Sequence, residues 1–227
     1  MPVFAALAAL IGGVFGLTLL NQYRGRRKPY QLVWGAALLM FGLAALFEAI
    51  GLAAGWSAAD YKAYYLFGAL LNVGWLAVGE VYLLAPRRWG NGAALVMAII
   101  TVVSLIRIVI ATADPMQLHA QFPDDRKTLD VPAALPAVTN SLASVILVLG
   151  ALWSAWRAYR RSAPWGLVVG TALIAAGAFV IAAFHGGAAV GHTPALRPIS
   201  EAIGIAIMFG GYLVLEAERP ALRPQTA

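Results

Sequence analysis

Residues 26–54 read RRKPYQLVWGAALLMFGLAALFEAIGLAA, and residues 161–189, which lie 135 positions later, read RSAPWGLVVGTALIAAGAFVIAAFHGGAA. Ten of the 26 positions from Pro29 onward are identical. The identical positions include four glycines that align in pairs, Gly35 with Gly170 and Gly42 with Gly177. Both copies contain apolar runs of about the 20 residues that a helix needs to cross a bilayer. We interpret the stretch as part of one half of a duplicated helical membrane protein.

The composition of the whole chain agrees with this interpretation. The 227 residues are 61% hydrophobic and only 11% charged, and the mean hydropathy is +0.78, whereas a soluble domain carries about 25% charged residues. The net charge of +6 does not indicate nucleic acid, because the basic residues flank apolar runs as topology signals do. The chain has no cysteine, which excludes disulfides and thiolate metal sites.

The apolar runs predict an all-α polytopic membrane protein with seven transmembrane helices in one domain, residues 1–227. The predicted helices are Val3–Gln22, Gln31–Ala54, Lys62–Leu84, Asn91–Thr112, Ala133–Tyr159, Trp165–Ala189 and Arg197–Glu216. Loops and edges after the first, third and fifth helices, together with the tail, hold eleven of the 16 Lys and Arg residues. Because cytoplasmic loops are rich in these residues, we expect the N-terminus outside and the C-terminus in the cytoplasm.

The repeat extends beyond its first stretch. At the same offset, Leu7 and Ile11 align with Leu142 and Ile146, and a slip of one residue aligns Glu80 with Glu216. Three helices per repeat keep the same orientation only if one more helix lies between the copies. The sequence therefore predicts a 3+1+3 parallel repeat. Its parts are repeat one (1–88), an inverter helix (90–112), an outer loop (113–132) and repeat two (133–223). GxxxG pairs such as Gly12/Gly16, Gly51/Gly55, Gly166/Gly170 and Gly187/Gly191 would let these helices pack closely.

This seven-helix, 3+1+3 plan resembles the SWEET and PQ-loop transporters and the related receptor-like and opsin-like architecture. The resemblance is one of topology over the whole chain, and no family motif matches. In place of Pro-Gln the two copies have Pro29-Tyr30-Gln31 and Pro164-Trp165-Gly166. The last helix has no lysine between Glu201 and Glu216 for a retinal Schiff base. The resemblance therefore implies a solute-binding membrane protein, and it implies neither sugar transport nor a retinal pigment.

Polar side chains inside the predicted spans mark the candidate site, because each is costly in a bilayer unless it has a function or a partner. With a rise of about 1.5 Å per residue, the polar groups of five helices fall at one level near the outer surface. The predicted ligand-binding residues are Glu48, Asn72, Trp75, Arg107, Asn140, His185 and Glu201. Arg107, the only basic residue well inside a span, could clamp an anion or balance the carboxylates. The repeated Glu80 and Glu216 lie near cytoplasmic ends, where we expect ion pairs with Arg87/Arg88 and Arg219/Arg223.

A metal is an alternative occupant of the same level. His185, His192, Glu48 and Glu201 are the candidate ligands, although no HxxxH or HExxH spacing is present. His185 could also pass protons, since its reference pKa of about 6.5 lies near neutrality. The sequence identifies no cofactor and no catalytic motif.

Three functions stay open from the sequence. We favour a small-solute-binding integral protein, transporter or receptor-like, with an outward-facing polar pocket. The alternatives are a membrane-embedded metal-dependent hydrolase or oxidoreductase and a structural subunit of a larger membrane complex. The predicted partners are the lipid bilayer, a small-molecule or ion ligand, and another copy or a membrane protein, but no nucleic acid. We expect a multi-pass protein of the plasma (inner) membrane.

Overall fold

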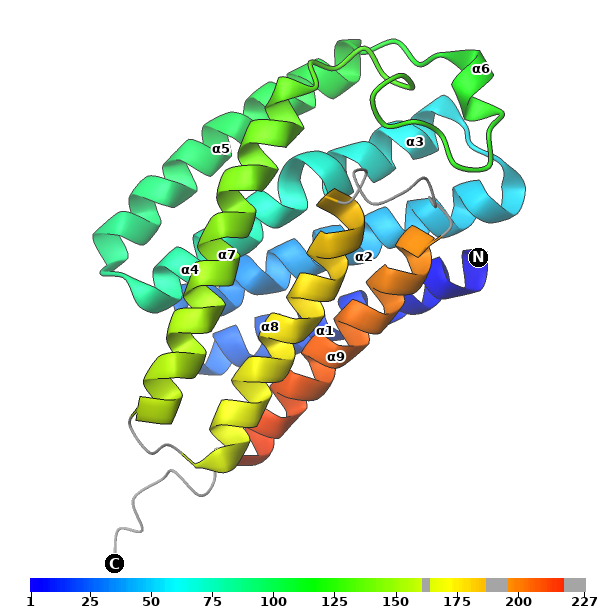
Figure 1. Cartoon of the computed structure of the whole chain (residues 1–227). Coiled ribbons are helices and arrows are strands. Elements are labelled where there is room, and N and C mark those ends of the chain that lie inside the picture. The colour runs from blue at the N-terminus through cyan, green and yellow to red at the C-terminus, as the bar shows by residue number, and fades with distance from the viewer. Residues whose placement is uncertain (161–163, 187–195, 219–227) are drawn as a thin grey trace, which may run out of the picture.

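Long helices make up this computed structural model, which describes residues 1–160, 164–186 and 196–218, without the side chains of residues 158 and 182–186 (Figure 1). The described residues are 86% helical and include no strands, which confirms the predicted all-α class. Six helices are long and apolar enough to cross a membrane, and a shorter apolar helix covers Trp165–Ile181. Lengths of this kind are those of a multi-pass membrane protein.

The helix bounds follow the predicted spans to within a few residues. The third span differs in kind, because a π-helical segment divides it into three consecutive pieces. The described elements are α1 (Pro2–Arg26), α2 (Pro29–Ala54), α3 (Ala58–Tyr64), η1 (Tyr65–Asn72), α4 (Val73–Leu84), α5 (Arg87–Ile110), α6 (Pro115–Leu118), α7 (Ala134–Arg160), α8 (Trp165–Gly186) and α9 (Leu196–Glu218).

Short-range signals set several helix ends. α1 and α2 each carry proline in the first turn, where its missing N–H removes no helical hydrogen bond. Arg27, between these helices, is left-handed (φ 52°), and its N–H donates to the Tyr23 carbonyl, which closes α1 as a helix C-cap does. Ser57 Oγ accepts the Asp60 N–H at the start of α3, a standard N-cap. The tight turn at Arg27 makes α1 and α2 antiparallel neighbours.

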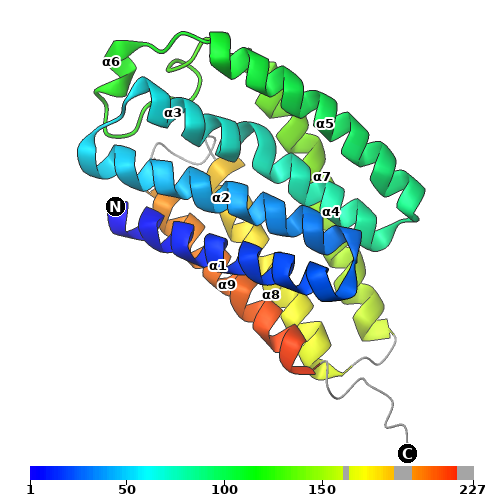
Figure 2. The same ribbon diagram turned by 180° about the vertical axis from the view of Figure 1, so that it is seen from behind.

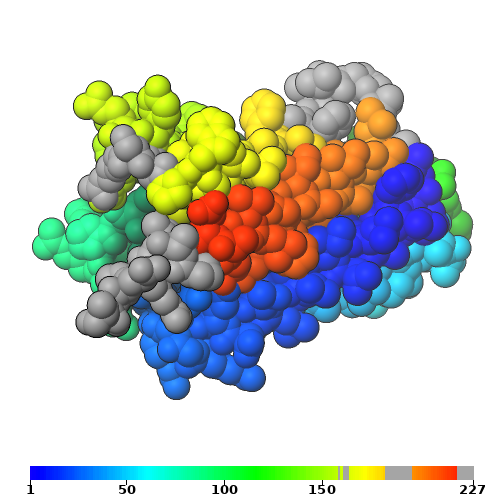
Figure 3. Space-filling model, turned by 90° about the horizontal axis from the view of Figure 1, so that it is seen from below, coloured from blue at the N-terminus to red at the C-terminus, as the bar shows by residue number. Residues whose placement is uncertain are grey.

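Six helices pack side by side in a closed order. α1 contacts α2, α2 contacts α4, α4 contacts α7, α7 contacts α8, α8 contacts α9, and α9 returns to α1. Figure 3 shows the last of these contacts, with orange-red α9 lying against dark-blue α1. α5 packs outside this ring, on α4 and η1 (Figures 1 and 2). α5 is therefore not part of this closed order.

Close glycine contacts join two of the helix pairs. A Cβ added to Gly16 of α1 would lie 2.9 Å from the Gly35 carbonyl oxygen of α2. A Cβ added to Gly177 of α8 would lie 2.4 Å from the Gly204 carbonyl oxygen of α9. Gly35 thus faces α1, whereas its sequence counterpart Gly170 faces α9, through Gly211. The aligned glycines consequently pack on different neighbours, one on the preceding helix and one on the following helix.

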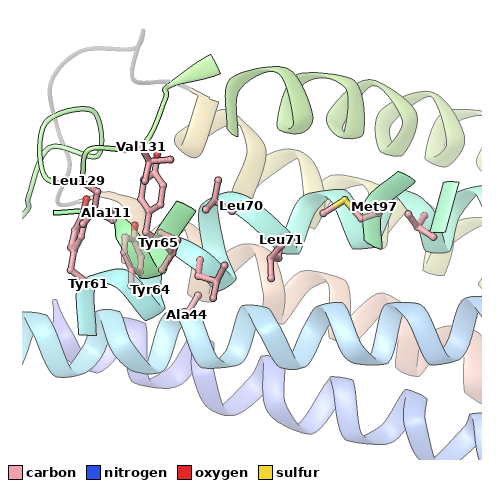
Figure 4. Packing of buried hydrophobic residues seen from close by; sticks show 13 residues of the cluster. Ala44, Tyr61, Tyr64, Tyr65, Leu70, Leu71, Met97, Ala111, Leu129 and Val131 are labelled. Atoms are coloured by element: carbon pink, nitrogen blue, oxygen red, sulfur yellow. The ribbon is translucent and has the colours of Figure 1, made fainter. Parts of the chain in front are cut away.

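The segment between α5 and α7 folds over one end of the bundle. Leu129 and Val131 are buried with Ala111 and the tyrosines of α3 and η1 (Figure 4). Backbone hydrogen bonds from Asp114 N to Thr128 O and from Asp130 N to Thr112 O hold the two ends of the segment together. We refer to residues 113–132 as the outer loop. Its apolar side chains anchor it to the helices, so it covers the end of the bundle where the N-terminus also lies (Figure 2).

The π-helix η1 is anchored from two sides. The Asn72 side chain donates to the Ala37 carbonyl of α2 at 3.0 Å. The Asn140 side chain of α7 donates to the Ala69 carbonyl inside η1 at 2.8 Å. An eight-residue π-helix is uncommon, and short π segments in proteins concentrate at functional sites. The two asparagines hold this segment between α2 and α7.

Candidate functional site

Two glutamates meet between α2 and α9. Glu48 lies near the C-terminal end of α2, and Glu201 lies in the second turn of α9. Their exposed fractions are only 2% and 4%, and the two carboxyl groups are close enough to interact directly. Glu48 Oε2 is buried and has no hydrogen-bond partner in the described structure. α2 and α9 thus place two buried acids against each other.

An ion pair covers these acids from the outer loop. Arg197, one turn before Glu201 on α9, pairs with Asp125 of the outer loop at 3.0 Å between Nη2 and Oδ2. The Tyr61 hydroxyl donates to the second Asp125 oxygen, Oδ1, at 2.7 Å. Arg197 Nη1 also donates to the Tyr64 hydroxyl. Among the described residues, Asp125 and Arg197 are charged groups that lie near Glu48 in addition to Glu201.

We call Glu48, Asp125, Arg197 and Glu201, with Tyr61 and Tyr64, the outer charge cluster. Among the described side chains, three carboxyl groups share one guanidinium there, so acids outnumber bases. Buried charges without partners are very costly, and like charges in contact add to this cost. The cluster therefore favours a bound proton or a small cation over an anion.

Arg107 lies outside this cluster. It occupies the last turn of α5, which packs on α4 and η1 outside the ring. The half-buried side chain leaves its Nε without a hydrogen-bond partner in the described structure. Its depth matches that of Glu48, but depth along a helix axis says nothing about position around the bundle. The structure places Arg197 where the sequence analysis had expected Arg107 to act.

The other predicted contacts tie helices together. Asn72 and Asn140 bond backbone carbonyls next to and within η1, and Trp75 Nε1 donates to Thr101 Oγ1 of α5 at 3.1 Å. The buried Oδ1 of Asn140 accepts no hydrogen bond in the described structure. These hydrogen bonds join η1 to α2 and α7, and α4 to α5.

Two histidines, His185 and His192, belong to the metal hypothesis. The backbone of His185 belongs to the last turn of α8, but its side chain and all of His192 lie outside the described residues. Among the residues that are described, no three His, Asp or Glu side chains are arranged to hold a metal. Of the four candidate ligands, the structure describes the side chains of Glu48 and Glu201.

A surface hollow lies elsewhere. It has a volume of about 640 Å³ and runs from the C-terminal end of α2, past Trp56, to residues 115–121 of the outer loop. None of the predicted ligand-binding residues lines it. Within the outer charge cluster, Glu48 and Glu201 are instead almost fully buried, and the Arg197–Asp125 pair near them is partly exposed. The two acids thus form a buried polar pair and do not line the hollow.

The two repeated glutamates near the opposite end each contact another helix. Glu216 pairs with Arg26 of α1, at 3.7 Å between Oε2 and Nη2, and its expected partners Arg219 and Arg223 lie outside the described residues. Glu80 makes no ion pair with Arg87 or Arg88 in the described structure. It lies instead against Gly150 of α7, where a Cβ added to the glycine would be 2.4 Å from Glu80 Oε1.

Sequence reasoning missed Arg197 and Asp125. Arg197 stands at a predicted helix start, where a basic residue reads as solvated, and Asp125 stands in a loop. One signal was available, because Arg197 and Glu201 are four residues apart and so share a helix face. No such signal existed for Asp125, since a loop residue of this kind finds its partner only through the path of the chain.

Comparison with protein families, curated proteins and solved structures found no match to this chain.

Proposed function

We propose that this chain is a small-solute-binding integral membrane protein, transporter or receptor-like, whose outer charge cluster takes up a proton or a small cation. One observation carries the proposal: the carboxyl groups of Glu48 and Glu201 adjoin each other in an almost fully buried position. Intramembrane acids facing a bundle interior commonly mark ion paths and proton relays. A purely structural pair of helices would gain nothing from two adjacent buried acids.

A proton suits the cluster better than a metal ion. A proton needs only two carboxyl oxygens that share it, and such a pair is present. A bound Na⁺ or Ca²⁺ would need several oxygen ligands, about six to eight for calcium. Arg197 already pairs with Asp125 at 3.0 Å, whereas Glu48 and Glu201 adjoin each other. We infer that these two groups share a single proton, which removes the repulsion between their carboxylates.

The proposed architecture is the seven-crossing 3+1+3 plan with the N-terminus outside. Two features support it. The ring order α1–α2–α4–α7–α8–α9 is the one that a two-fold axis along the membrane normal would generate from two triplets. The basic turns after α1 and α4 lie at one end of the bundle, opposite α6 (Figure 2). The different packing of Gly35 and Gly170 means that the copies would have diverged in helix rotation.

We propose that lipid surrounds the exposed faces of α5 and α7. Only 17% of the most apolar window of α5 and 11% of that of α7 are buried within the structure. Large apolar side chains such as Leu95, Ile99, Leu142 and Leu149 are exposed on these helices. Exposed apolar surface of this extent needs a bilayer or another membrane protein to cover it.

Infrared spectroscopy of the purified protein tests the proton site. A shared proton should give one carboxyl C=O band that disappears as pH is raised, and both Glu48→Gln and Glu201→Gln should shift or remove this same band. Asp130→Asn is the matched control, because Asp130 is an exposed acid of the outer loop without a side-chain partner. Two independent bands, or no change in either variant, would contradict the proposal.

A further inference from the structure

A second polar cluster lies at the other end of the interface between α1, α2 and α9. The Gln31 side chain of α2 donates to Gln22 Oε1 of α1 at 3.1 Å. Gln22 in turn donates from Nε2 to the hydroxyl of Tyr212 on α9. The three side chains form a continuous hydrogen-bonded chain across three helices.

The chain of hydrogen bonds ends beside a charged pair. Glu216 follows Tyr212 by one turn on α9 and pairs with Arg26 of α1. The charges of Glu216 and Arg26 both act on Tyr212, and they also act on Tyr30 at the start of α2. We call Gln22, Gln31 and Tyr212, with Arg26 and Glu216, the inner polar cluster. The Arg26–Glu216 pair is partly exposed, with side-chain fractions of 42% and 27%, so the cluster opens toward the end of the bundle.

Gln31 gives the strongest sign that this cluster does more than join helices. Its exposed fraction is 0%, yet its Oε1 is buried without a hydrogen-bond partner in the described structure. A buried polar atom left unpaired costs about 1–3 kcal/mol. The unpaired acceptor, Gln31 Oε1, thus lies inside the contact of three helices. It belongs to a hydrogen-bonded chain whose last member, Tyr212, is one turn from Glu216 on α9.

The inner and outer clusters share one helix interface. On α9, Arg197, Glu201, Tyr212 and Glu216 recur at helical spacing and so lie along one face. On α2, Gln31 and Glu48 are 17 residues apart, or about 25 Å along the axis. Both helices thus present an acid at the outer end and hydrogen-bonding groups at the inner end.

An apolar barrier separates the two clusters. Five buried side chains between them, from all three helices, belong to one packed group: Phe15, Leu38, Phe41, Ala45 and Ile205. The Tyr212 ring closes this group from the inner side, with its centroid 5.0 Å from the Phe15 ring and 6.1 Å from the Phe209 ring. The hydroxyl of Tyr212 thus belongs to the inner cluster while its ring belongs to the barrier.

We infer that the inner polar cluster is a second station for the proton held by Glu48 and Glu201, so that the α1–α2–α9 interface is a proton path with two ends. This inference rests on the proposed function, because it takes the outer carboxyl pair as the first station. The structure shows the path closed, since the apolar group lies between the stations. Transfer requires the rings of Phe15, Phe209 and Tyr212 to part.

The proton balance of this path is simple. The shared proton leaves the Glu48–Glu201 pair, which becomes two carboxylates, and a proton from the outer side restores it. At the inner end the Tyr212 hydroxyl gives its proton to the Glu216 carboxylate and takes up the incoming proton, and Glu216 then releases one proton to the inner solution. No bond other than O–H and N–H bonds forms or breaks, and the electrochemical gradient supplies the driving force.

Proton flux into proteoliposomes tests the inference. The full-length protein is reconstituted with a trapped pH-sensitive dye, and a potassium diffusion potential drives protons. We expect the wild type to carry protons and Tyr212→Phe to reduce the flux roughly tenfold or more, the scale at which a positioned proton-transfer group acts. Tyr212→Phe keeps the ring and removes only the hydroxyl. Gln31→Leu should have an effect in the same direction.

Tyr82→Phe is the matched control. In the wild type the Tyr82 hydroxyl donates to Asn91 Oδ1 at 2.9 Å in an exposed position away from the path. The proton flux of Tyr82→Phe should therefore equal that of the wild type. The infrared band of the outer carboxyl pair should stay unchanged in Tyr212→Phe and Gln31→Leu. An intact band with no wild-type flux, or with equal flux in both variants, overturns the two-station path and leaves the proposed function standing. If Glu48→Gln leaves the infrared carboxyl band unchanged, the proposed function itself is overturned.

Discussion

Arg197 of α9 reaches across the end of the bundle to Asp125 of the outer loop, with 3.0 Å between Nη2 and Oδ2. The two residues are 72 positions apart, and their contact closes the loop over Glu48 and Glu201. Both side chains are partly buried, with exposed fractions of 25% and 35%. An ion pair in this setting is worth more than a fully exposed one, and it makes the outer loop part of the site.

Removing Asp125 should destabilise the protein. In Asp125→Ala, Arg197 loses its carboxylate and Tyr61 loses its acceptor, so we expect a loss of about 1–3 kcal/mol in unfolding free energy. Thermal unfolding in detergent measures this loss. Asp130→Ala, in the same loop but exposed and unpaired in the described structure, should change stability by less than about 0.5 kcal/mol. Equal effects of the two variants would show that the ion pair does not hold the loop.

Replacing one of the paired acids should stabilise the protein in alkaline solution. Glu48→Gln removes one of two adjacent buried carboxyl groups, and with it their mutual repulsion when both are ionised. We expect a higher unfolding temperature than that of the wild type at alkaline pH, and a smaller difference at acidic pH, where a proton already neutralises the pair. A lower unfolding temperature at alkaline pH would mean that Arg197 needs the Glu48 charge.

The α8–α9 contact should tolerate no side chain at Gly177. A Cβ there would lie 2.4 Å from the Gly204 carbonyl oxygen, which is backbone and cannot rotate away. Gly177→Ala should therefore push the helices apart and cost about 1–3 kcal/mol. Gly210→Ala on α9 is the control, because a Cβ there has no neighbour within 4 Å. Unfolding of both variants in parallel checks the prediction, and a Gly177→Ala protein as stable as the control would refute the close contact.

The π-helix should loosen without Asn140. Asn140→Leu removes the 2.8 Å hydrogen bond to the Ala69 carbonyl, a bond between membrane helices worth about 0.6–1.7 kcal/mol. Amide hydrogen exchange over residues 65–72, followed by mass spectrometry, should accelerate, by about fivefold for each 1 kcal/mol lost. Thr139→Val is the adjacent control, since the Thr139 hydroxyl bonds only the Leu135 carbonyl of its own helix. Unchanged exchange in Asn140→Leu would show that η1 holds itself together.

Much of the fold follows from local properties of the chain. Apolar runs of membrane-spanning length, proline at N1 of α1 and α2, and the basic clusters place the helices and their ends, because each of these signals acts over a few residues. Glu48 and Glu201 were recognised as candidate site residues for the same reason, since a charge inside an apolar run is costly wherever the run lies.

The partners of those residues needed the tertiary structure. Sequence positions give the depth of a side chain in the bilayer, and Arg107 matches Glu48 in depth. They do not give the rotation of a helix or its place in the ring, and α5 stands outside the ring. The π-helix also escapes sequence reasoning, because the asparagines that anchor it bond carbonyls of other helices.

By itself the sequence determined that this is an all-helical membrane protein with acids buried in its spans, because hydrophobic length and charge cost are local quantities. Only the packing of the helices decided that Glu48 meets Glu201, that Arg197 rather than Arg107 stands beside them, and that Asp125 closes the cluster. Those contacts join α2, α9 and the outer loop, and they depend on how helices and loops are arranged around the ring, which no single stretch of sequence specifies.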